Sequence, residues 1–341
     1  MPPEDSKERR KPPSLGQRAS FLARFARGVP ANIPIPNPLE RRTLEKAVGG
    51  KVVLITGASS GIGKALALKV AAAGGEVILV ARTREKLEDV AAEIEASGGI
   101  AHVHPADLSE IESVARLGDE VLAEHGRVDV LVNNAGRSIR RSVANSYDRI
   151  HDFQRTIDLN YLGAVQLVLK VLPGMRERKS GHIVNVSSMG VQTNTPRFSA
   201  YVASKAALDA FSRSIASEIV DDRVAISTVY MPLVRTPMIQ PTTHYKYFPS
   251  ISPEEAADMV ADAIVSRNKK QSTLGGRISE VSYATVPRVQ DAIANAAYKL
   301  FPESDSAKKP REKDAGAEEP GGEEGSVEQR AFARATRGVH W

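Results

Sequence analysis

Between Lys51 and Pro232 the sequence alternates between short apolar runs and longer stretches with helical spacing of apolar residues. Six of the short runs are rich in β-branched residues and are bounded by Gly, Pro, Asn or Asp, which predicts strands. The runs are KVVLITG, EVILVA, IAHVHPADL, VDVLVNNAG, GHIVNVSS and VAISTVYMP. Each predicted strand is followed by a helical stretch, and several of these stretches end at glycine. The pattern therefore predicts an α/β fold, a doubly wound parallel sheet with helices on both faces in a single domain.

The composition changes on both sides of this domain. Residues 1–50 hold ten Lys and Arg against five Asp and Glu, so this segment alone matches the formal net charge of +5 of the whole 341-residue chain. We predict a basic N-terminal arm at 1–50, the domain at 51–302, a disordered acidic linker at 303–328 and a C-terminal amphipathic segment at 329–341. The arm is interpreted as a solvated segment that docks on the domain or on a partner subunit; peripheral membrane contact is the alternative.

Composition also excludes several classes of function. The chain has no cysteine, which excludes disulfides, thiolate metal sites and a cysteine nucleophile, and we expect no metal among the site residues. The positive charge lies in the arm and no recognition motif for DNA or RNA is present, so nucleic acid is not an expected partner. No apolar run approaches the length of a membrane span or of a signal-peptide core, which predicts a cytoplasmic protein.

A glycine-rich turn, TGASSGIG, follows the first predicted strand and leads into a helix. Residues without side chains let the backbone approach a pyrophosphate, whose charge is favoured by the N–H groups at the helix start. Because the turn follows the first strand of a βαβ unit, it predicts a dinucleotide site. The candidate cofactor-binding residues in the turn are Thr56, Gly57, Ser59, Ser60, Gly61, Ile62 and Gly63.

Further candidate cofactor contacts follow the next three strands. Arg82 stands where an NAD-preferring site usually has an acid, and it could pair with a 2′-phosphate, which favours NADPH over NADH. The alternative is that Arg82 is only a solvated start to the next helix. After the third and fourth strands the candidates are Asp107, Asn133, Ala135 and Gly136, at the edge where open α/β sheets bind ligands. Asn pairs also make turns by bonding their own backbone.

Three residues are candidates for acid–base catalysis. Ser188 follows the fifth strand, and Tyr201 and Lys205 lie one helical turn apart, so their side chains share one helix face. A nearby ammonium favours the phenolate and lowers the pKa of a tyrosine towards the working range. Ser188 could hold the substrate oxygen. Packing alone does not explain this ordered set on a fold built for a dinucleotide.

In these motifs the chain resembles the classical short-chain dehydrogenases/reductases over about residues 50–270. The resemblance implies a Rossmann-type fold and a catalytic tetrad of Asn160, Ser188, Tyr201 and Lys205, with Asn160 holding a water in a proton relay. It also implies cofactor contacts at Tyr201, Lys205, Val234 and Thr236. A homo-oligomer formed through the stretches 147–179 and 200–220 is a further implication. One departure is Leu233, where many members have glycine, which leaves open the backbone path there.

A narrower resemblance connects NNAGRSIRRSV, PRFSAYVASKAALDAFSR, MPLVRTPMI and PEEAADMVADAIV with the bacterial fatty acyl-CoA reductases. It implies a long-chain acyl-CoA or fatty aldehyde as the substrate and a substrate lid at about 237–270, for which the candidate lining residues are Met238, Tyr245, Tyr247 and Phe248. Arg137, Arg140 and Arg141 could receive CoA phosphates, or they could form a solvated basic face.

The predicted activity is hydride transfer from NADPH to the carbonyl carbon of the acyl-CoA, with Tyr201 as general acid; further reduction of the aldehyde to alcohol is compatible with it. Two alternatives remain. One is a reductase of another carbonyl or alcohol on the same scaffold, and the other is a non-catalytic scaffold whose arm and tail bind partners. The complete tetrad argues against the scaffold.

Overall fold

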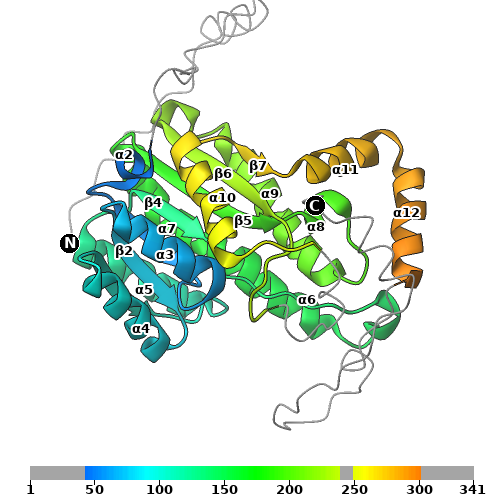
Figure 1. Cartoon of the computed structure of the whole chain (residues 1–341), viewed down its shortest axis with the longest axis horizontal. Coiled ribbons are helices and arrows are strands. Elements are labelled where there is room, and N and C mark those ends of the chain that lie inside the picture. Colours follow the sequence, from blue (N-terminus) through cyan, green and yellow to red (C-terminus); the bar gives the residue numbers. More distant parts are fainter. Residues whose placement is uncertain (1–42, 239–248, 301–341) are drawn as a thin grey trace, which may run out of the picture. The chain divides into compact units, whose positions relative to one another are not determined.

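A computed structural model describes residues 43–238 and 249–300 of the chain (Figure 1). In these ranges seven strands form one sheet in the order β3-β2-β1-β4-β5-β6-β7, and every neighbouring pair is parallel. The strand order changes direction between β1 and β4, so the predicted doubly wound sheet is confirmed. The strands are β1 (Val52–Thr56), β2 (Glu76–Ala81), β3 (Ile100–Pro105), β4 (Val130–Asn133), β5 (Gly181–Ser188), β6 (Val224–Met231) and β7 (Lys270–Ser272).

Helices connect the strands and cover the sheet. The longer helices are α3 (Gly61–Ala72), α4 (Arg84–Ala96), α5 (Ile111–His125), α6 (Ile150–Ile157), α7 (Gly163–Glu177), α9 (Ser199–Ala216), α10 (Pro253–Ser266), α11 (Leu274–Thr285) and α12 (Pro287–Leu300). The shorter ones are α2 (Leu44–Val48), α8 (Gly190–Thr193), η1 (Val143–Asn145), η3 (Val220–Asp222) and the π-helical turn η2 (Asp158–Leu162). Across the described residues, no helix is both long enough and apolar enough to cross a membrane.

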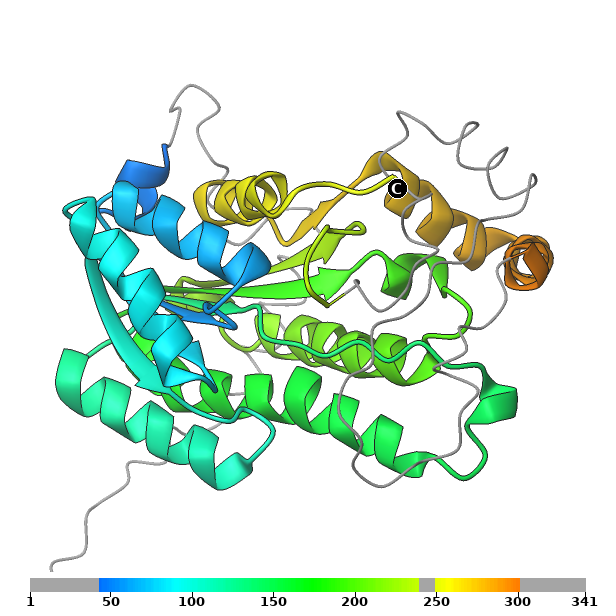
Figure 2. The same ribbon diagram turned by 60° about the horizontal axis from the view of Figure 1, so that its bottom comes forward.

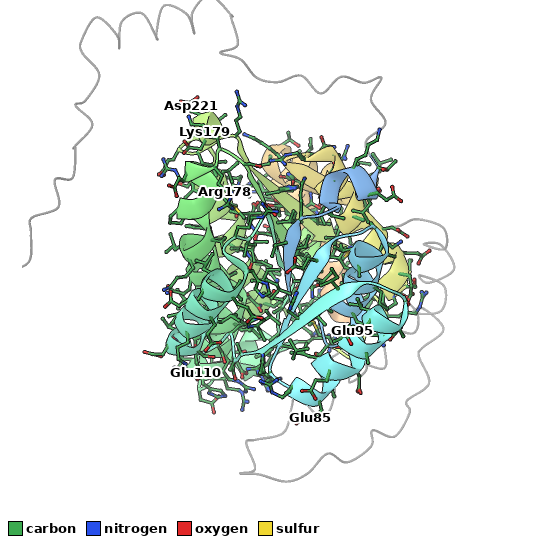
Figure 3. All side chains as sticks on the ribbon, turned by 90° about the vertical axis from the view of Figure 1, so that its left-hand side faces the viewer. Glu85, Glu95, Glu110, Arg178, Lys179 and Asp221 are labelled. Atoms are coloured by element: carbon green, nitrogen blue, oxygen red, sulfur yellow. The ribbon has the colours of Figure 1, made fainter. Side chains whose placement is uncertain are left out.

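Two apolar cores lie on opposite faces of the sheet. On one face, Leu66 of α3 and Val260 of α10 belong to one cluster; on the other, Leu117 of α5 and Leu167 of α7 belong to a second. Figure 2 shows the two layers, with α3 and α10 on one side of the sheet and α7 on the other. Charged side chains such as Glu85 and Glu95 of α4 remain exposed on the outer surface (Figure 3). The central strands are buried on both faces, and this explains their continuous apolar sequence.

The structure interrupts the stretch 147–179, which the sequence suggests as one helix. α6 ends at Ile157, the chain passes through the π-helical turn η2, and α7 begins at Gly163. A Cβ at Gly163 would lie 2.1 Å from the carbonyl oxygen of Leu108, so this glycine permits a close approach between α7 and the segment after β3. Residues 1–42, 239–248 and 301–341, and with them most of the predicted arm, the linker, the C-terminal segment and the lid residues Tyr245, Tyr247 and Phe248, lie outside the described residues.

Candidate active site

The glycine turn lies between the end of β1 and the start of α3. Gly57 and Gly61 have φ angles of +67° and +54°, a region that favours glycine. A Cβ at Gly63 would lie 2.2 Å from the carbonyl oxygen of Gly57, so the turn folds directly onto the first turn of the helix. Between them, Ser60 is the N-terminal cap residue of α3 but makes no side-chain cap hydrogen bond, and Ser59 and Ile62 are half-buried. The turn therefore has the shape and the helix N-terminus that suit a pyrophosphate.

Thr56 joins this turn to the segment after β4. Its Oγ1 donates to the carbonyl oxygen of Val132 at 3.2 Å and accepts from the backbone N–H groups of Asn134 and Ala135 at 2.9 and 3.0 Å. The side chain of Asn134 donates to the carbonyl oxygen of Thr56 at 2.8 Å. The glycine turn and the Asn-Asn-Ala-Gly segment are thus held as one unit at the carboxyl edge of the sheet.

The two asparagines of that segment have different roles. Asn133 points into the protein, where its Nδ2 donates to Asn185 Oδ1 at 2.8 Å, and Asn185 in turn donates to Ser212 Oγ at 2.8 Å. Asn134, which was not among the predicted site residues, holds the glycine turn through its side chain. The doubled Asn in the sequence is the only signal that could have indicated it, because nothing in the pattern says which amide faces the turn.

A group of cationic side chains surrounds Asp107. Although partial burial opposes it, hydrogen bonds from the hydroxyl and backbone N–H of Ser109 and the positive charges of Arg82 and Arg137 lower the pKa of Asp107. Burial and the positive charges of Arg155 and Arg82 lower the pKa of Arg137. Two guanidinium groups thus act on the Asp107 carboxylate and a third, Arg155, acts on Arg137, which leaves an excess of positive charge that favours an anionic ligand.

Ser188, Tyr201 and Lys205 come together where β5 ends against α9. The Ser188 hydroxyl accepts from the backbone N–H of Gly190 at 3.0 Å and is hydrogen-bonded to the Tyr201 phenol. Burial raises the pKa of Tyr201, and the hydrogen bond with Ser188 opposes that rise. The ammonium of Lys205 donates to the carbonyl oxygen of Val186 at 2.8 Å, and burial lowers its pKa to about 8. The predicted lowering of the Tyr201 pKa by Lys205 is not found; Tyr201 is held as a protonated acid.

Asn160 lies in the π-helical turn η2, and such turns are frequent at functional sites. It is buried; its Oδ1 accepts from the backbone N–H of Arg137 at 2.8 Å, and its Nδ2 donates to the Arg137 carbonyl oxygen and to Ser204 Oγ, each at 2.9 Å. A Cβ at Gly136 would lie 3.2 Å from both Asn160 Oδ1 and Lys205 Nζ. The fourth predicted tetrad member therefore lies close to the lysine and directly supports the segment after β4.

The segment after β6 closes the site from the side of the cofactor turn. Thr236 lies against the turn, since a Cβ at Gly61 would be 3.0 Å from Thr236 Cγ2. Val234 is buried and forms a parallel bridge with Ile251. The φ angle of Leu233 is not positive, so the backbone there accepts leucine in place of glycine without strain.

A cavity of about 420 Å³ lies between the segment after β4, the segment that precedes α9, and α12, and neither Ser188 nor Tyr201 is among its lining residues. A Cβ at Gly190 would lie 3.2 Å from Ser188 Oγ, 3.4 Å from Val202 Cγ2 and 3.7 Å from Thr195 Oγ1, and both Val202 and Thr195 line the cavity. At the other end, the guanidinium of Arg197 lies 3.9 Å from the ring centroid of Tyr298 on α12. The remaining lining residues are Arg141, Ser142, Val143, Ala144, Asn194, Pro196 and Ser199.

This fold, with a serine, a tyrosine and a lysine together at the carboxyl edge of the sheet, is typical of dinucleotide-dependent oxidoreductases. The short chain dehydrogenase family matches residues 51–246. An uncharacterized oxidoreductase of Mycobacterium tuberculosis is 54% identical over 308 residues, covering 89% of this chain and 88% of the relative. A fatty acyl-CoA reductase of Acinetobacter baylyi is 51% identical over 294 residues, covering 86% and 96%. The crystal structure of a metagenomic short-chain oxidoreductase in complex with NADP is 33% identical, with a TM-score of 0.57, covering 67% of this chain and 97% of that one. The chain belongs to the short chain dehydrogenase family, and it is an oxidoreductase.

Proposed function

We propose that this protein reduces long-chain fatty acyl-CoA to fatty aldehyde with NADPH, and that the aldehyde can be reduced further to the alcohol. The observation that carries the proposal is the meeting of Ser188, Tyr201 and Lys205 where β5 ends against α9, at the carboxyl edge of the sheet. The Acinetobacter relative, similar over most of both chains, supports a thioester substrate. A reductase of another carbonyl or alcohol on the same site is the second candidate.

The cationic group around Asp107 supports NADPH as the cofactor. Arg82 follows the end of β2, where a dinucleotide's adenosine ribose is expected in this fold, and its positive charge acts on Asp107 and on Arg137. A 2′-phosphate adds negative charge that guanidinium groups pair with well. Residues of the glycine turn, with Val234 and Thr236 on its other side, would hold the rest of the dinucleotide. The bound dinucleotide would supply the hydride.

Tyr201 and Ser188 supply what the carbonyl oxygen needs. As the carbonyl carbon gains a hydride, its oxygen develops negative charge, which the Ser188 hydroxyl stabilises by hydrogen bonding and Tyr201 neutralises by donating its proton. The raised pKa of Tyr201 keeps the phenol protonated at neutral pH, ready for that step. The chain has no cysteine, so no acyl-cysteine forms; the hemithioacetal collapses directly, releasing CoA as a thiol and leaving the aldehyde.

The surroundings of the cavity bear on how an acyl-CoA would bind. Val202, Val143 and Ala144 offer apolar surface to an acyl chain, and Arg137 and Arg140 remain candidates for the CoA phosphates. Arg141 has another role, because its Nε lies 3.1 Å from Oδ2 of the buried carboxylate of Asp152, which also holds Arg149 at 3.1 Å. The homo-oligomer, the cytoplasmic location and the membrane contact of the arm stay predictions.

The decisive experiment measures two products at once. Purified protein is given a long-chain acyl-CoA or the matching fatty aldehyde, with NADPH or NADH, and cofactor oxidation is followed by absorbance. Released CoA is followed with a thiol reagent, which has no background from the protein because the chain lacks cysteine. We expect one CoA for each acyl-CoA reduced and a higher kcat/KM with NADPH than with NADH. Oxidation with the aldehyde alone would replace the proposal with the second candidate.

The pH dependence of reduction should report Lys205. Its ammonium shares the helix face of Tyr201 and is a candidate contact for the bound dinucleotide, to which only the protonated form can donate all three hydrogen bonds. Because burial lowers the pKa of Lys205 to about 8, the ammonium is present below that pH and lost above it, whereas Tyr201, with its raised pKa, stays protonated. We expect kcat/KM to be level below about pH 8 and to fall about tenfold per pH unit above it. The measurement is a pH profile of kcat/KM.

Lys205→Arg is the control, because its guanidinium stays charged in this pH range. This variant should show no alkaline fall in the activity that it retains. An identical fall in Lys205→Arg would rule out Lys205 as its cause.

A further inference from the structure

A second cluster of chemically active side chains lies where β2 and β3 meet the end of α5. Glu76 is the first residue of β2, His102 and His104 lie on β3, and Glu124 and His125 end α5. His102 and His104 are two positions apart and therefore share one face of the strand. None of these residues belongs to the candidate active site, and none was singled out from the sequence.

Three side chains in this cluster place their ligand atoms, with both oxygens of Glu124 counted, at separations close to those around a tetrahedral metal ion. Nε2 of His104 lies 3.4 Å from Nε2 of His125 and 3.5 Å from Oε2 of Glu124, and Nε2 of His125 lies 3.7 Å from Oε1 of Glu124. A tetrahedral ion with bonds of about 2.0–2.1 Å separates its ligand atoms by about 3.3–3.4 Å. The three side chains need only small rotations to bind one ion.

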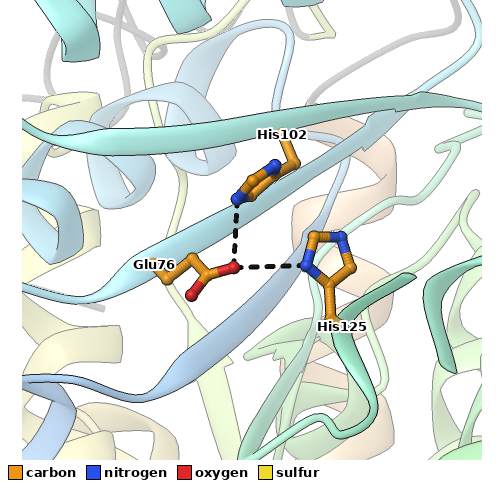
Figure 4. Close-up of side chains that lie close together, drawn as sticks. All are labelled: Glu76, His102 and His125. Carbon is orange, nitrogen blue, oxygen red and sulfur yellow. Dashed lines mark hydrogen bonds and ion pairs between the residues drawn. The ribbon is translucent and has the colours of Figure 1, made fainter. Parts of the chain in front are cut away.

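Glu76 is placed to orient the imidazole of His125 as a metal ligand. Its Oε1 lies 3.2 Å from Nδ1 of His125 (Figure 4). When the carboxylate accepts the Nδ1–H, Nε2 of His125, which lies 3.4 Å from Nε2 of His104, keeps its lone pair. A carboxylate behind a ligating histidine is the arrangement that orients many metal-bound imidazoles. The same Oε1 lies 3.0 Å from Nε2 of His102, a buried nitrogen for which that contact does not have hydrogen-bond geometry. The direct bonds of the cluster thus leave a buried polar atom unsatisfied.

We propose that His104, His125 and Glu124 bind one divalent transition-metal ion of the Zn²⁺ type, with Glu76 positioning His125. Two imidazoles and a carboxylate form a borderline-soft donor set that suits Zn²⁺, whereas Mg²⁺ and Ca²⁺ prefer oxygen ligands. The side chains of His104 and His125 are 8% and 4% exposed but that of Glu124 is 55% exposed, so an ion can enter from solvent and keep a water as a fourth ligand.

The ion would have a structural role. β3 is an edge strand of the sheet, and the three ligands join it to the last turn of α5. An ion that binds only the folded chain stabilises that state, so thermal stability should rise with the concentration of free ion. Because the site shares no residue with the Ser188–Tyr201 centre, the proposal does not depend on the identity of the substrate.

The test uses the full chain, stripped of metal with a chelator and then titrated with Zn²⁺ by calorimetry. We expect one ion per chain and a Tm that rises with Zn²⁺. Co²⁺ should give the intense visible absorption of four-coordinate cobalt. Glu124→Ala changes an exposed helical position and should abolish Zn²⁺ binding, with its rise in Tm, and the cobalt absorption. His104→Gln should do the same. Glu76→Gln should weaken Zn²⁺ affinity by about 10–100-fold. Glu112→Ala, in the first turn of the same helix, should bind as the wild type does.

Several results would overturn the proposal. Wild-type chain that binds no Zn²⁺ would do so, and so would binding that survives unchanged in both Glu124→Ala and His104→Gln. Binding lost only on substitution of Glu76 and His102 would place the ion among other ligands and reject the assigned three.

Discussion

Tyr201→Phe should lower kcat/KM for carbonyl reduction by about 10²–10⁴-fold, the usual contribution of a positioned general acid. The substitution removes only the phenolic oxygen, which is hydrogen-bonded to Ser188 and gives the proton to the developing oxyanion. The ring remains, so its packing against Phe198, the N-terminal cap residue of α9, is retained; the two ring centroids lie 6.4 Å apart. The measurement is the steady-state rate of NADPH oxidation at saturating cofactor.

A matched variant separates this effect from the loss of any tyrosine hydroxyl. Tyr161 on η2 packs edge-on against Phe211, with ring centroids 6.5 Å apart, and Tyr161→Phe should leave kcat/KM near the wild-type value. NADPH affinity, measured by fluorescence titration, should be unchanged in Tyr161→Phe and should fall far less than kcat/KM in Tyr201→Phe, which also removes a candidate cofactor contact. If Tyr201→Phe reduces its substrate as fast as Tyr161→Phe does, another group is the general acid.

Gly63→Ala should damage the cofactor site and the stability of the domain together. The new Cβ would lie 2.2 Å from the carbonyl oxygen of Gly57 and 2.7 Å from Asn134 Nδ2, so the turn must move by about 1 Å relative to α3. Such a displacement can cost about 100-fold in rate. Overpacking against a backbone atom costs about 1–3 kcal/mol in the free energy of unfolding, more than the gain of up to about 1 kcal/mol from alanine in a helix. Cofactor titration and chemical denaturation measure the two effects.

Gly174→Ala is the matched control for Gly63→Ala. Gly174 lies inside α7, and a Cβ there would meet only the guanidinium end of Arg178, 3.0 Å away, which can move. We expect unchanged NADPH affinity and stability equal to or slightly above that of the wild type. Equal NADPH affinity in Gly63→Ala and Gly174→Ala would contradict the close fit of the turn described above.

Much of the fold was predictable because its cause is local. A parallel strand covered on both faces must be continuously apolar, and this property is visible in the runs that became β1 to β6. β7 was missed because Lys270–Ser272 is short, polar and at an edge, so burial imposes no pattern on it. The break at η2 was also missed, since the apolar spacing of the stretch 147–179 continues through the π-helical turn.

The sequence by itself determined the family and the candidate site: a glycine turn after the first strand, and Ser188, Tyr201 and Lys205 in an order that suits acid–base catalysis. Residue type and spacing carry that information because a phosphate needs a bare backbone and a proton transfer needs ionisable groups on one helix face. Tertiary structure decided the rest. Burial in the tertiary structure raises the pKa of Tyr201. Contacts between segments direct Asn133 into the protein and Asn134 towards the glycine turn. Similar contacts pair Arg141 with Asp152 and bring together His104, Glu124 and His125. Burial and contacts between distant segments cause each of these, and neither is encoded in local spacing.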